Sequence, residues 1–333
     1  MAIKLNVRDL AVELPTPTGW VCPVNGVSFA LGESEALGIV GESGSGKTML
    51  SLALMGLLPP GARTRGEAWL QSSANGGKRA AQDLLAATPS EMRRVRGRRI
   101  AMIFQEPMTA LNPVVRVGAQ VAEAIRAHES GLSAKEVDEQ VLTALERAAV
   151  PDPARRARQY PHELSGGLRQ RATIAIALAA GPDVLIADEP TTALDVTVQK
   201  QILDLLESLR RDLRLSMLFI THDLGVVARV ADRIAVMYAG RIVEEGATAE
   251  VLRHPAHPYT AGLLLAAPGL AREKLVAIPG AAPALDALPR GCSFAPRCAR
   301  RAPNCEERVP ELACVSATSE THRARCIRVH EPT

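Results

Sequence analysis

Aromatic residues are few in this sequence, and no apolar run is long enough to cross a bilayer. Phe, Trp and Tyr together account for 3% of the 333 residues. The longest apolar stretch is ATIAIALAA at 172–180, and a membrane-spanning helix needs about 20 such residues. The N-terminal sequence MAIKLNVRDLAVEL alternates like a strand and lacks the apolar segment of a signal peptide. We therefore expect a cytosolic chain that does not cross a membrane by itself.

An excess of charge is also lacking. The formal net charge is +3, which is too small to indicate a nucleic-acid partner by itself. Apolar residues make up 47% and charged residues 23% of the chain, as in ordinary soluble globular proteins. The length allows one large domain and one smaller domain.

Cysteine is scarce over most of the chain and concentrated near its end. The first 290 residues contain only Cys22, whereas GCSFAPRCARRAPNC at 291–305 contains three cysteines, and Cys314 and Cys326 follow. Disulfides are rare in the cytosol, and zinc sites usually use close CxxC pairs, which are absent. An iron–sulfur cluster needs four thiolates and is not tied to one spacing. Iron–sulfur, zinc and free thiols all remain open.

Buried strands alternate with helical patterns along the chain, which predicts an α/β fold with a parallel sheet covered on both faces. The expected strands are ALGIV (36–40), IAMIF (100–104), VLIADE (184–189), SMLFIT (216–221) and RIAVMY (233–238). The clearest helical patterns cover 48–58 and 196–213.

Two segments depart from this alternation. Residues 106–165 contain helical patterns and no convincing strand, which indicates a helical subdomain inserted into the α/β core. After about 250 the sequence becomes rich in proline and small residues, which marks a domain boundary. We predict a main domain over 1–253 and a small cysteine-containing C-terminal domain over 254–333.

A phosphate-binding loop follows the first buried strand. The stretch GESGSGKT matches G-x-x-x-x-G-K-[ST] and opens a helix, so its backbone N–H groups and the helix N-terminus would cradle phosphate oxygens. Lys47 would reach the β- and γ-phosphates, and the Thr48 hydroxyl would bind Mg²⁺. The predicted loop comprises Gly41, Glu42, Ser43, Gly44, Ser45, Gly46, Lys47 and Thr48.

A pair of carboxylates ends the strand VLIADE. The carboxyl ends of parallel strands line the ligand crevice, so Asp188 and Glu189 should face the phosphates. Successive strand residues point in different directions, which suits two roles. We expect Asp188 to hold the Mg²⁺ shell and Glu189 to polarise the attacking water.

A third motif suggests a pair of chains. In LSGGLRQRATIAIALAA (164–180), Ser165 can cap a helix, and Gly166 and Gly167 leave its first turn bare. One nucleotide has one γ-phosphate, which the phosphate loop already holds. A second anion site therefore predicts a sandwich in which each chain contributes to the other's ATP.

These three motifs together resemble the ATP-binding cassette ATPases, over about residues 3–250, and so imply a P-loop NTPase (RecA-like) core that hydrolyses ATP. The resemblance implies that Gln105 contacts Mg²⁺ and couples to a membrane partner, and that His222 contacts the γ-phosphate. It also implies that Gln170 belongs to the signature motif and Asp195, after Ala193 and Leu194, to the loop communicating across the sandwich. Trp20 is the candidate for stacking on adenine, with packing at the sheet edge as the alternative.

The tail resembles the C-terminal region of oligopeptide/dipeptide importer ATPases, through HPYTAGLLLAAPGL, IPGAAPAL and GCSFAPRC. The motif FQEPMTALNP at 104–113 points to the same subfamily. This likeness implies a peripheral subunit on the cytoplasmic face of the inner membrane. Its implied partners are a second cassette subunit, identical or homologous, two permeases and an extracytoplasmic solute-binding protein. It also implies a [4Fe-4S] cluster on four of the cysteines, namely Cys292, Cys298, Cys305 and Cys326.

Two other functions remain as alternatives. A soluble cassette ATPase acting on nucleic acid or ribosomes is one, but the basic run MRRVRGRR at 92–99 lacks interleaved aromatics and leads directly into a core strand. A non-hydrolysing scaffold subunit is the other, and the intact Glu189, LSGG and His222 argue against it. We therefore expect no nucleic-acid partner, and the sequence does not name the solute.

Overall fold

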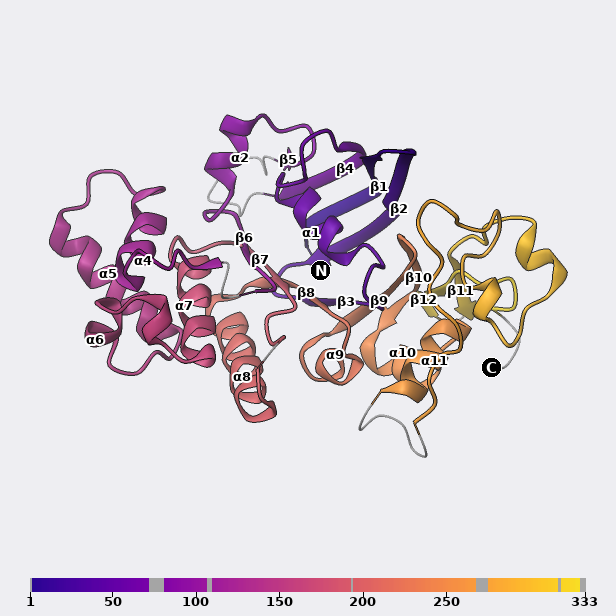
Figure 1. Ribbon diagram of the computed structural model, residues 1–333. Coiled ribbons are helices and arrows are strands. Elements are labelled where there is room, and N and C mark those ends of the chain that lie inside the picture. The colour runs from indigo at the N-terminus through magenta and orange to yellow at the C-terminus, as the bar shows by residue number, and fades with distance from the viewer. Residues whose placement is uncertain are drawn as a thin grey trace.

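The computed structural model describes residues 2–71, 81–106, 110–192, 194–267, 275–316 and 319–329. An eight-stranded sheet crosses the middle of the molecule, with α1 and a smaller antiparallel sheet on one side and α8 to α11 on the other (Figure 1). Within the described residues, no helix is long and apolar enough to span a membrane.

The parallel part of the large sheet consists of the five strands predicted from the sequence, which confirms the α/β core. Its order is β9-β3-β8-β7-β6, and every neighbouring pair in this part is parallel. Nearly all of their residues are buried, because helices or the second sheet cover both faces. The bounds are β3 (Ala36–Val40), β6 (Ile100–Ile103), β7 (Val184–Asp188), β8 (Ser216–Thr221) and β9 (Arg233–Tyr238).

Three antiparallel strands extend this sheet beyond β9, and the sequence does not predict them. They are β10 (Arg241–Ala247), β11 (Ala313–Ser316) and β12 (Ser319–Ala324). The tail strand β12 pairs directly with β10, with Glu244 opposite Ala324. The C-terminal segment is therefore joined to the main sheet by backbone hydrogen bonds, and the domain boundary near 253 stays a prediction.

The smaller sheet is antiparallel and has the order β2-β1-β4-β5. Its strands are β1 (Ile3–Thr16), β2 (Gly19–Gly32), β4 (Arg63–Gln71) and β5 (Ala81–Asp83). Only the first of these has a clear alternating pattern in the sequence. Apolar side chains from β1 and β2 form one core with α1 and with one face of the parallel strands.

Ten helices are described. They are α1 (Lys47–Leu54), α2 (Pro89–Val95), α4 (Val117–Arg126), α5 (Ala134–Arg147), α6 (Pro153–Ala157), α7 (Gly166–Leu178), α8 (Val196–Leu213), α9 (Leu224–Val230), α10 (Thr248–Arg253) and α11 (Pro258–Ala266). Helices α4 to α7 gather at one end of the molecule, coloured magenta (Figure 1). A capping box formed by Ser133 and Glu136 fixes the start of α5.

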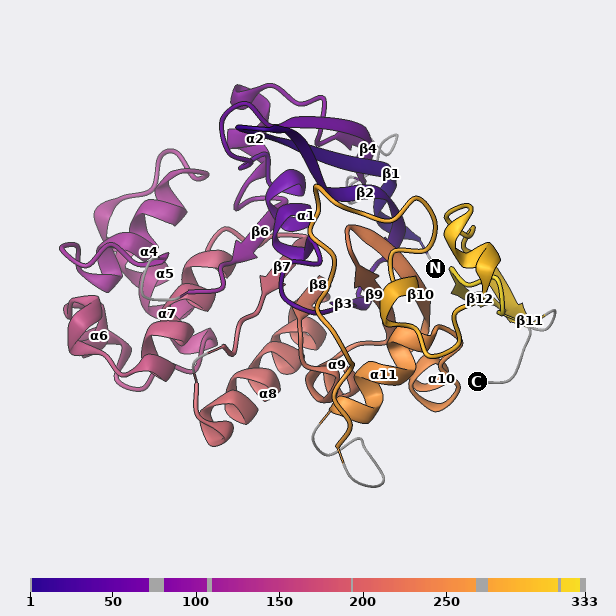
Figure 2. The same cartoon turned by 45° about the vertical axis from the view of Figure 1, so that its right-hand side comes forward.

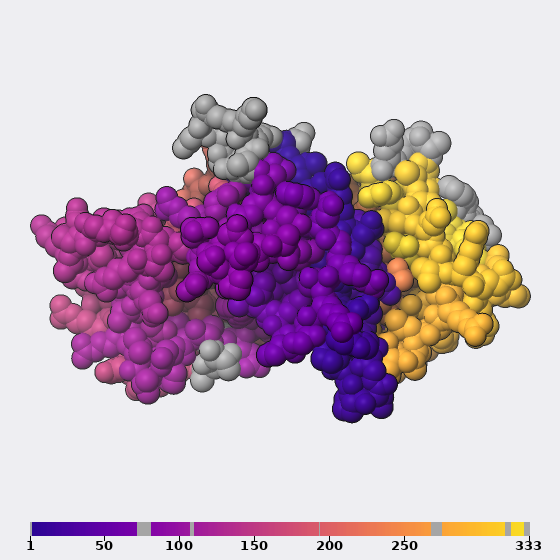
Figure 3. Space-filling model, turned by 90° about the horizontal axis from the view of Figure 1, so that it is seen from above, coloured from indigo at the N-terminus to yellow at the C-terminus, as the bar shows by residue number. Residues whose placement is uncertain are grey.

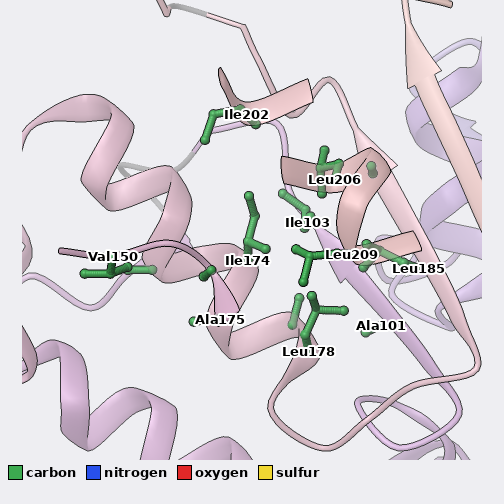
Figure 4. Packing of buried hydrophobic residues seen from close by; sticks show 14 of the residues in the cluster. Ala101, Ile103, Val150, Ile174, Ala175, Leu178, Leu185, Ile202, Leu206 and Leu209 are labelled. Carbon is green, nitrogen blue, oxygen red and sulfur yellow. The ribbon is translucent and has the colours of Figure 1, made fainter. Parts of the chain in front are cut away.

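Helices α7 and α8 pack on the strands that carry the acidic pair. Ile174 and Leu178 of α7 meet Leu206 and Leu209 of α8 over Leu185 of β7 (Figure 4). All five are buried. This apolar layer packs against one face of β7. The position of the C-terminal end of β7 therefore depends on the layer.

The described C-terminal residues lie beside the N-terminal strands and α11. The two views of the ribbon place them at the same end of the sheet, and the space-filling view shows them against the indigo strands (Figures 1, 2 and 3). A shared apolar cluster includes Tyr238 of β9, Tyr259 of α11 and Phe294 of the tail. The tail is therefore packed on the core rather than suspended from it.

We predict that Leu206→Ala lowers the free energy of unfolding by about 3 kcal/mol, because it leaves a cavity in a fully buried layer. The exposed fraction of Leu206 is 0%. Urea denaturation followed by circular dichroism would measure the change. Val196→Ala in the same helix is the control, since Val196 is 83% exposed and should shift the value by less than about 0.5 kcal/mol. Equal losses for both variants would contradict the packing described here.

Candidate nucleotide site

The phosphate loop joins the C-terminal end of β3 to α1. Gly46 occupies the N-cap position of α1 with φ of 103°, and no side chain caps this helix. The N–H groups of its first turn thus stay available to an anion. A Cβ atom on Gly46 would lie 1.9 Å from the carbonyl oxygen of Pro23 in β2, so the loop requires glycine here both for its dihedral angle and for space.

Lys47 is folded back onto the loop. Its Nζ donates to the carbonyl oxygens of Gly41 (2.8 Å) and Glu42 (2.9 Å). Burial lowers the pKa of this ammonium group, and the negative charges of Glu189, Asp188 and Glu42 oppose that shift. One lysine and three carboxylates thus act on one another at the carboxyl end of β3.

Asp188 ends β7 in a buried position, with an exposed fraction of 1%. The Ser51 hydroxyl donates to its Oδ2 (3.3 Å), whereas its Oδ1 is buried and accepts no hydrogen bond from the described residues. Burial raises the pKa of this carboxyl, and the hydroxyls of Thr48 and Ser51 lower it. A buried acceptor without a donor is costly, and a hydrated Mg²⁺ ion beside Thr48 would satisfy it.

Glu189 follows with a backbone φ of 47°, in the left-handed region that non-glycine residues rarely occupy. Its carboxylate is held by three partners from different elements. Thr192 Oγ1 donates to Oε2 (2.8 Å), Gln105 Nε2 approaches the same oxygen (3.4 Å), and His222 Nδ1 lies 3.1 Å from Oε1. The structure thus brings together Gln105, Glu189 and His222 at the carboxyl ends of β6, β7 and β8, as the sequence predicts.

The signature residues lie on a separate surface. Ser165 caps α7 by accepting a hydrogen bond from Leu168 N (3.4 Å), and Ser165 and Gly166 are exposed. The structure does not bring them into contact with the phosphate loop of the same chain. Asp195 is also exposed and caps α8 through Val198 N (2.9 Å), whereas Ala193 lies outside the described residues.

Gln170 is placed differently from the other signature residues. Its exposed fraction is 1%, and neither atom of its amide has a hydrogen-bond partner within the described chain. The side chain therefore points into the molecule, one turn along α7 from Ser165. A direct contact between Gln170 and the nucleotide of a second chain would need this residue to leave its buried position.

Trp20 lies at the start of β2, three positions before Pro23, whose carbonyl oxygen adjoins the phosphate loop. Its ring is 45% exposed, and the Arg63 guanidinium lies 4.0 Å from the ring centroid. Phe29, the other aromatic residue near the loop in sequence, is buried in the core. One face of the Trp20 ring is thus covered by a cation, and stacking on adenine stays a prediction.

Comparison with known proteins identifies the family. Residues 24–192, about half of the chain, match the family described as ABC transporter. The chain belongs to this family. Residues 243–305 match the oligopeptide/dipeptide transporter C-terminal region, which confirms the subfamily resemblance seen in the tail.

Several relatives are similar over most of their length. The cassette is 50% identical over 298 residues to the oligopeptide transport ATP-binding protein OppD of Bacillus subtilis, which covers 88% of this chain and 80% of the relative. It is 46% identical over 326 residues to the dipeptide transport ATP-binding protein DppD of the same organism, with 97% and 93% covered. Among solved structures, the ATP-binding cassette MJ0796 bound to ADP and Pi, a dimer in a post-hydrolysis state, aligns with a TM-score of 0.63. That alignment has 25% identity and covers 73% of this chain and 98% of the other.

The tail cysteines of the cassette separate into a group of four and one outlier. Cys292, Cys298, Cys305 and Cys326 line a single cavity, whereas Cys314 is exposed on β11. No disulfide bond joins any of the six cysteines. Burial raises the pKa of Cys292 to about 11 and also raises the pKa values of Cys298 and Cys326, with Cys305 adding to each shift. The structure thus brings together the four cysteines singled out by the resemblance, although no group of three metal-binding side chains in ligand geometry occurs among the described residues.

Two residues near the phosphate loop are absent from the sequence prediction. Arg297 pairs with Glu42, and the Tyr259 hydroxyl accepts a hydrogen bond from Glu42 N (2.8 Å). Neither residue belongs to a nucleotide-binding motif. Tyr259 falls within the HPYT motif of the tail, and this motif is the only signal in the sequence that could have suggested it.

We predict that Gly46→Ala weakens nucleotide binding by about a hundredfold, equivalent to about 3 kcal/mol, because an alanine Cβ cannot occupy the space against Pro23. Gly44→Ala is the matched control. Gly44 also has a positive φ of 78°, but nothing lies within 4 Å of its Cβ position. Gly44→Ala should weaken nucleotide binding by only about 1 kcal/mol, the cost of a left-handed backbone conformation for alanine. Titration with a fluorescent ATP analogue measures both, and equal losses would contradict the steric argument.

Proposed function

We propose that this chain is the ATPase subunit that powers import of di- and oligopeptides, or related solutes, through a membrane permease pair. The observation that carries the proposal is the Glu189 carboxylate, fixed by Thr192, Gln105 and His222 beside the buried Asp188 and Lys47. The peptide specificity rests on the tail and on the relatives, which are oligopeptide and dipeptide transport ATP-binding proteins.

The loop residues bind and neutralise the polyphosphate. Backbone N–H groups of the loop and of the first turn of α1 would surround it, apart from those of Glu42 and Ser45, which already have acceptors within the chain. The Lys47 ammonium would exchange its carbonyl partners for β- and γ-phosphate oxygens. Thr48, Asp188 and Gln105 would hold Mg²⁺, and the buried Oδ1 of Asp188, which has no hydrogen-bond partner among the described residues, is available to it. When bound, Mg²⁺ neutralises charge that develops on the phosphate oxygens.

Glu189 orients and polarises the attacking water. His222 Nδ1 lies 3.1 Å from its Oε1, so the imidazole and the carboxylate can act on the same water. Gln105 Nε2 and Thr192 Oγ1 hold Oε2 and restrict rotation of the carboxylate. Most of the rate acceleration then comes from positioning and fixed charge rather than from covalent chemistry.

The second chain completes the site. Ser165, Gly166 and Gly167 present the bare N-terminus of α7 on a surface that the chain's own nucleotide does not reach, which supports a sandwich with a second cassette subunit. Asp195 caps α8 beside this surface. The helices between 106 and 165 and the region of Gln105 face the permeases, on the cytoplasmic side of the membrane, and a solute-binding protein supplies the peptide from the other side. A soluble role on nucleic acid or ribosomes is less well supported, because the relatives are transport proteins.

We predict that Glu189→Gln lowers ATP turnover at least about a hundredfold and changes the Kd of ATP less than about threefold, because the amide keeps the size but cannot accept a proton. Phosphate release and nucleotide titration measure the two quantities. Glu139→Gln, on the exposed face of α5, is the control and should leave both unchanged. Undiminished turnover in Glu189→Gln would remove this residue from the catalytic role.

The four clustered cysteines are proposed to hold a [4Fe-4S] cluster that stabilises the tail. Four thiols around one cavity supply the right donor set. Burial raises the pKa values of Cys292, Cys298 and Cys326, which makes these thiols costly to ionise without a cation, and metal binding would offset that cost. The segment that carries Cys292, Cys298 and Cys305 forms only the short 3₁₀ turns Ala295–Arg297 and Pro303–Glu306 among its described residues, so a metal centre would stabilise it.

We predict that protein purified without oxygen absorbs broadly near about 400 nm and carries about four iron and four sulfide ions per chain. Cys298→Ser should lose the band and the iron. Cys314→Ser should keep both, because this cysteine lies outside the cavity. If the protein is colourless and contains zinc, the four cysteines form a zinc site instead of an iron–sulfur cluster. If it contains no metal, the four cysteines are thiols.

A further inference from the structure

A buried arginine from the tail reaches the phosphate loop. Arg297 Nη1 lies 2.6 Å from Oε2 of Glu42, and Nη2 lies 3.0 Å from Oε1, across 255 residues of sequence. The exposed fraction of the Arg297 side chain is 6% and that of Glu42 is 31%. A bidentate pair of this kind fixes direction as well as distance.

The guanidinium is itself held from several sides. Its Nε donates to the carbonyl oxygen of Pro279 (2.9 Å), and Nη1 approaches the Tyr238 hydroxyl (3.4 Å). The rings of Tyr238 and Phe294 each lie 5.9 Å from its central carbon. Arg297 is therefore a fixed group before any nucleotide arrives, and little side-chain freedom remains to be lost.

The same tail holds the loop backbone. The Tyr259 hydroxyl accepts a hydrogen bond from Glu42 N (2.8 Å), and Tyr259 is fully buried. The Glu42 carbonyl oxygen in turn accepts from Lys47 Nζ (2.9 Å). Contacts thus run from the tail through both the side chain and the backbone of Glu42 to the lysine of the phosphate loop.

The negative charge of Glu42 would disfavour phosphate binding if it were unpaired. A carboxylate inside a loop that binds a polyanion repels it, and its charge already acts on Lys47. Pairing with Arg297 cancels that repulsion, and the paired carboxylate still connects the tail to the phosphate loop.

We infer that Arg297 is a positioning residue for ATP binding, which neutralises Glu42 and, with Tyr259, holds the phosphate loop in its binding conformation. Arg297 ends the turn Ala295–Arg297, between Cys292 and Cys298. Hydrogen bonds within this turn, from Ala295 N to Cys292 O (3.0 Å) and from Arg297 N to Phe294 O (3.0 Å), set its place. The turn Ala295–Arg297, which Cys292 and Cys298 flank, is thereby part of the nucleotide site. The inference rests on the proposed function only in requiring that the chain binds ATP.

The test is the affinity of the full chain for an ATP analogue, measured together with kcat and KM. Arg297→Ala should raise Kd and KM at least about tenfold, because Glu42 is left unpaired beside the phosphates, and should change kcat less than about threefold. Higher ionic strength should reduce the defect, since salt screens the exposed carboxylate. Arg301→Ala is the matched control, because Arg301 lies four positions further along and makes a half-exposed pair with Glu306.

A second substitution separates charge from structure. Glu42→Gln in the Arg297→Ala background removes the unpaired charge and should recover most of the lost affinity. A purely structural role would not be rescued in this way. If Arg297→Ala proves unstable by thermal unfolding, Tyr259→Phe removes only the hydroxyl and should weaken binding several-fold.

Three outcomes would overturn the inference. These are unchanged affinity in Arg297→Ala, no rescue by Glu42→Gln, and an equal defect in Arg301→Ala. The proposed function fails separately, if the unaltered chain binds ATP but does not hydrolyse it.

Discussion

The alignment of five parallel strands with their carboxyl ends at one edge is the constraint on which the site depends. Phosphate loop, acidic pair, Gln105 and His222 follow β3, β7, β6 and β8, and these strands are neighbours in the sheet. Parallel pairing therefore brings residues that lie far apart in the sequence within hydrogen-bond distance, such as Gln105 and Glu189, which are 84 positions apart. The apolar layer of α7 and α8 beneath β7 keeps that edge in place, so stability of this layer and geometry of the Glu189 carboxylate are linked.

Several residues of the site have backbone conformations or environments that are unfavourable in free energy. Glu189 has a left-handed backbone, Gly46 adopts an angle available only to glycine, and Asp188 Oδ1 is buried without a donor. Each feature makes sense beside a bound nucleotide. Glu189 contacts Thr192, Gln105 and His222, whereas Asp188 accepts from Ser51. Gly46 leaves the N-terminus of α1 without a side-chain cap, and Asp188 Oδ1 is available to a polar ligand. The surrounding core compensates for these costs, because almost every residue of the five strands is buried.

Most of this site is readable from the sequence, because each motif is local and follows a continuous apolar strand. The five parallel strands are predicted at nearly their observed bounds for the same reason. The strands β10 to β12 are not predicted, since Glu244 and Glu245 interrupt the apolar pattern of β10 and the tail joins the sheet only through long-range pairing, such as Glu244 with Ala324. Gln170 shows a different limit: its place in a motif suggests a contact, whereas the helical period turns it inward. The pairing of Arg297 with Glu42 joins two segments 255 residues apart and has no sequence pattern at all.

That pairing changes how the tail is understood. A C-terminal segment that only stabilised itself would need no contact with the phosphate loop, yet Arg297 and Tyr259 both reach Glu42, and Tyr238 and Phe294 close an apolar cluster behind them. The tail also adds a strand to the central sheet through β12, so its position is fixed at two independent places. A segment fixed in this way can hold the phosphate loop only while its own turns keep their shape. Cys305 lies in one of those turns, and Cys292 and Cys298 flank the other. The integrity of the cysteine cavity and the affinity for ATP are therefore coupled through one guanidinium group.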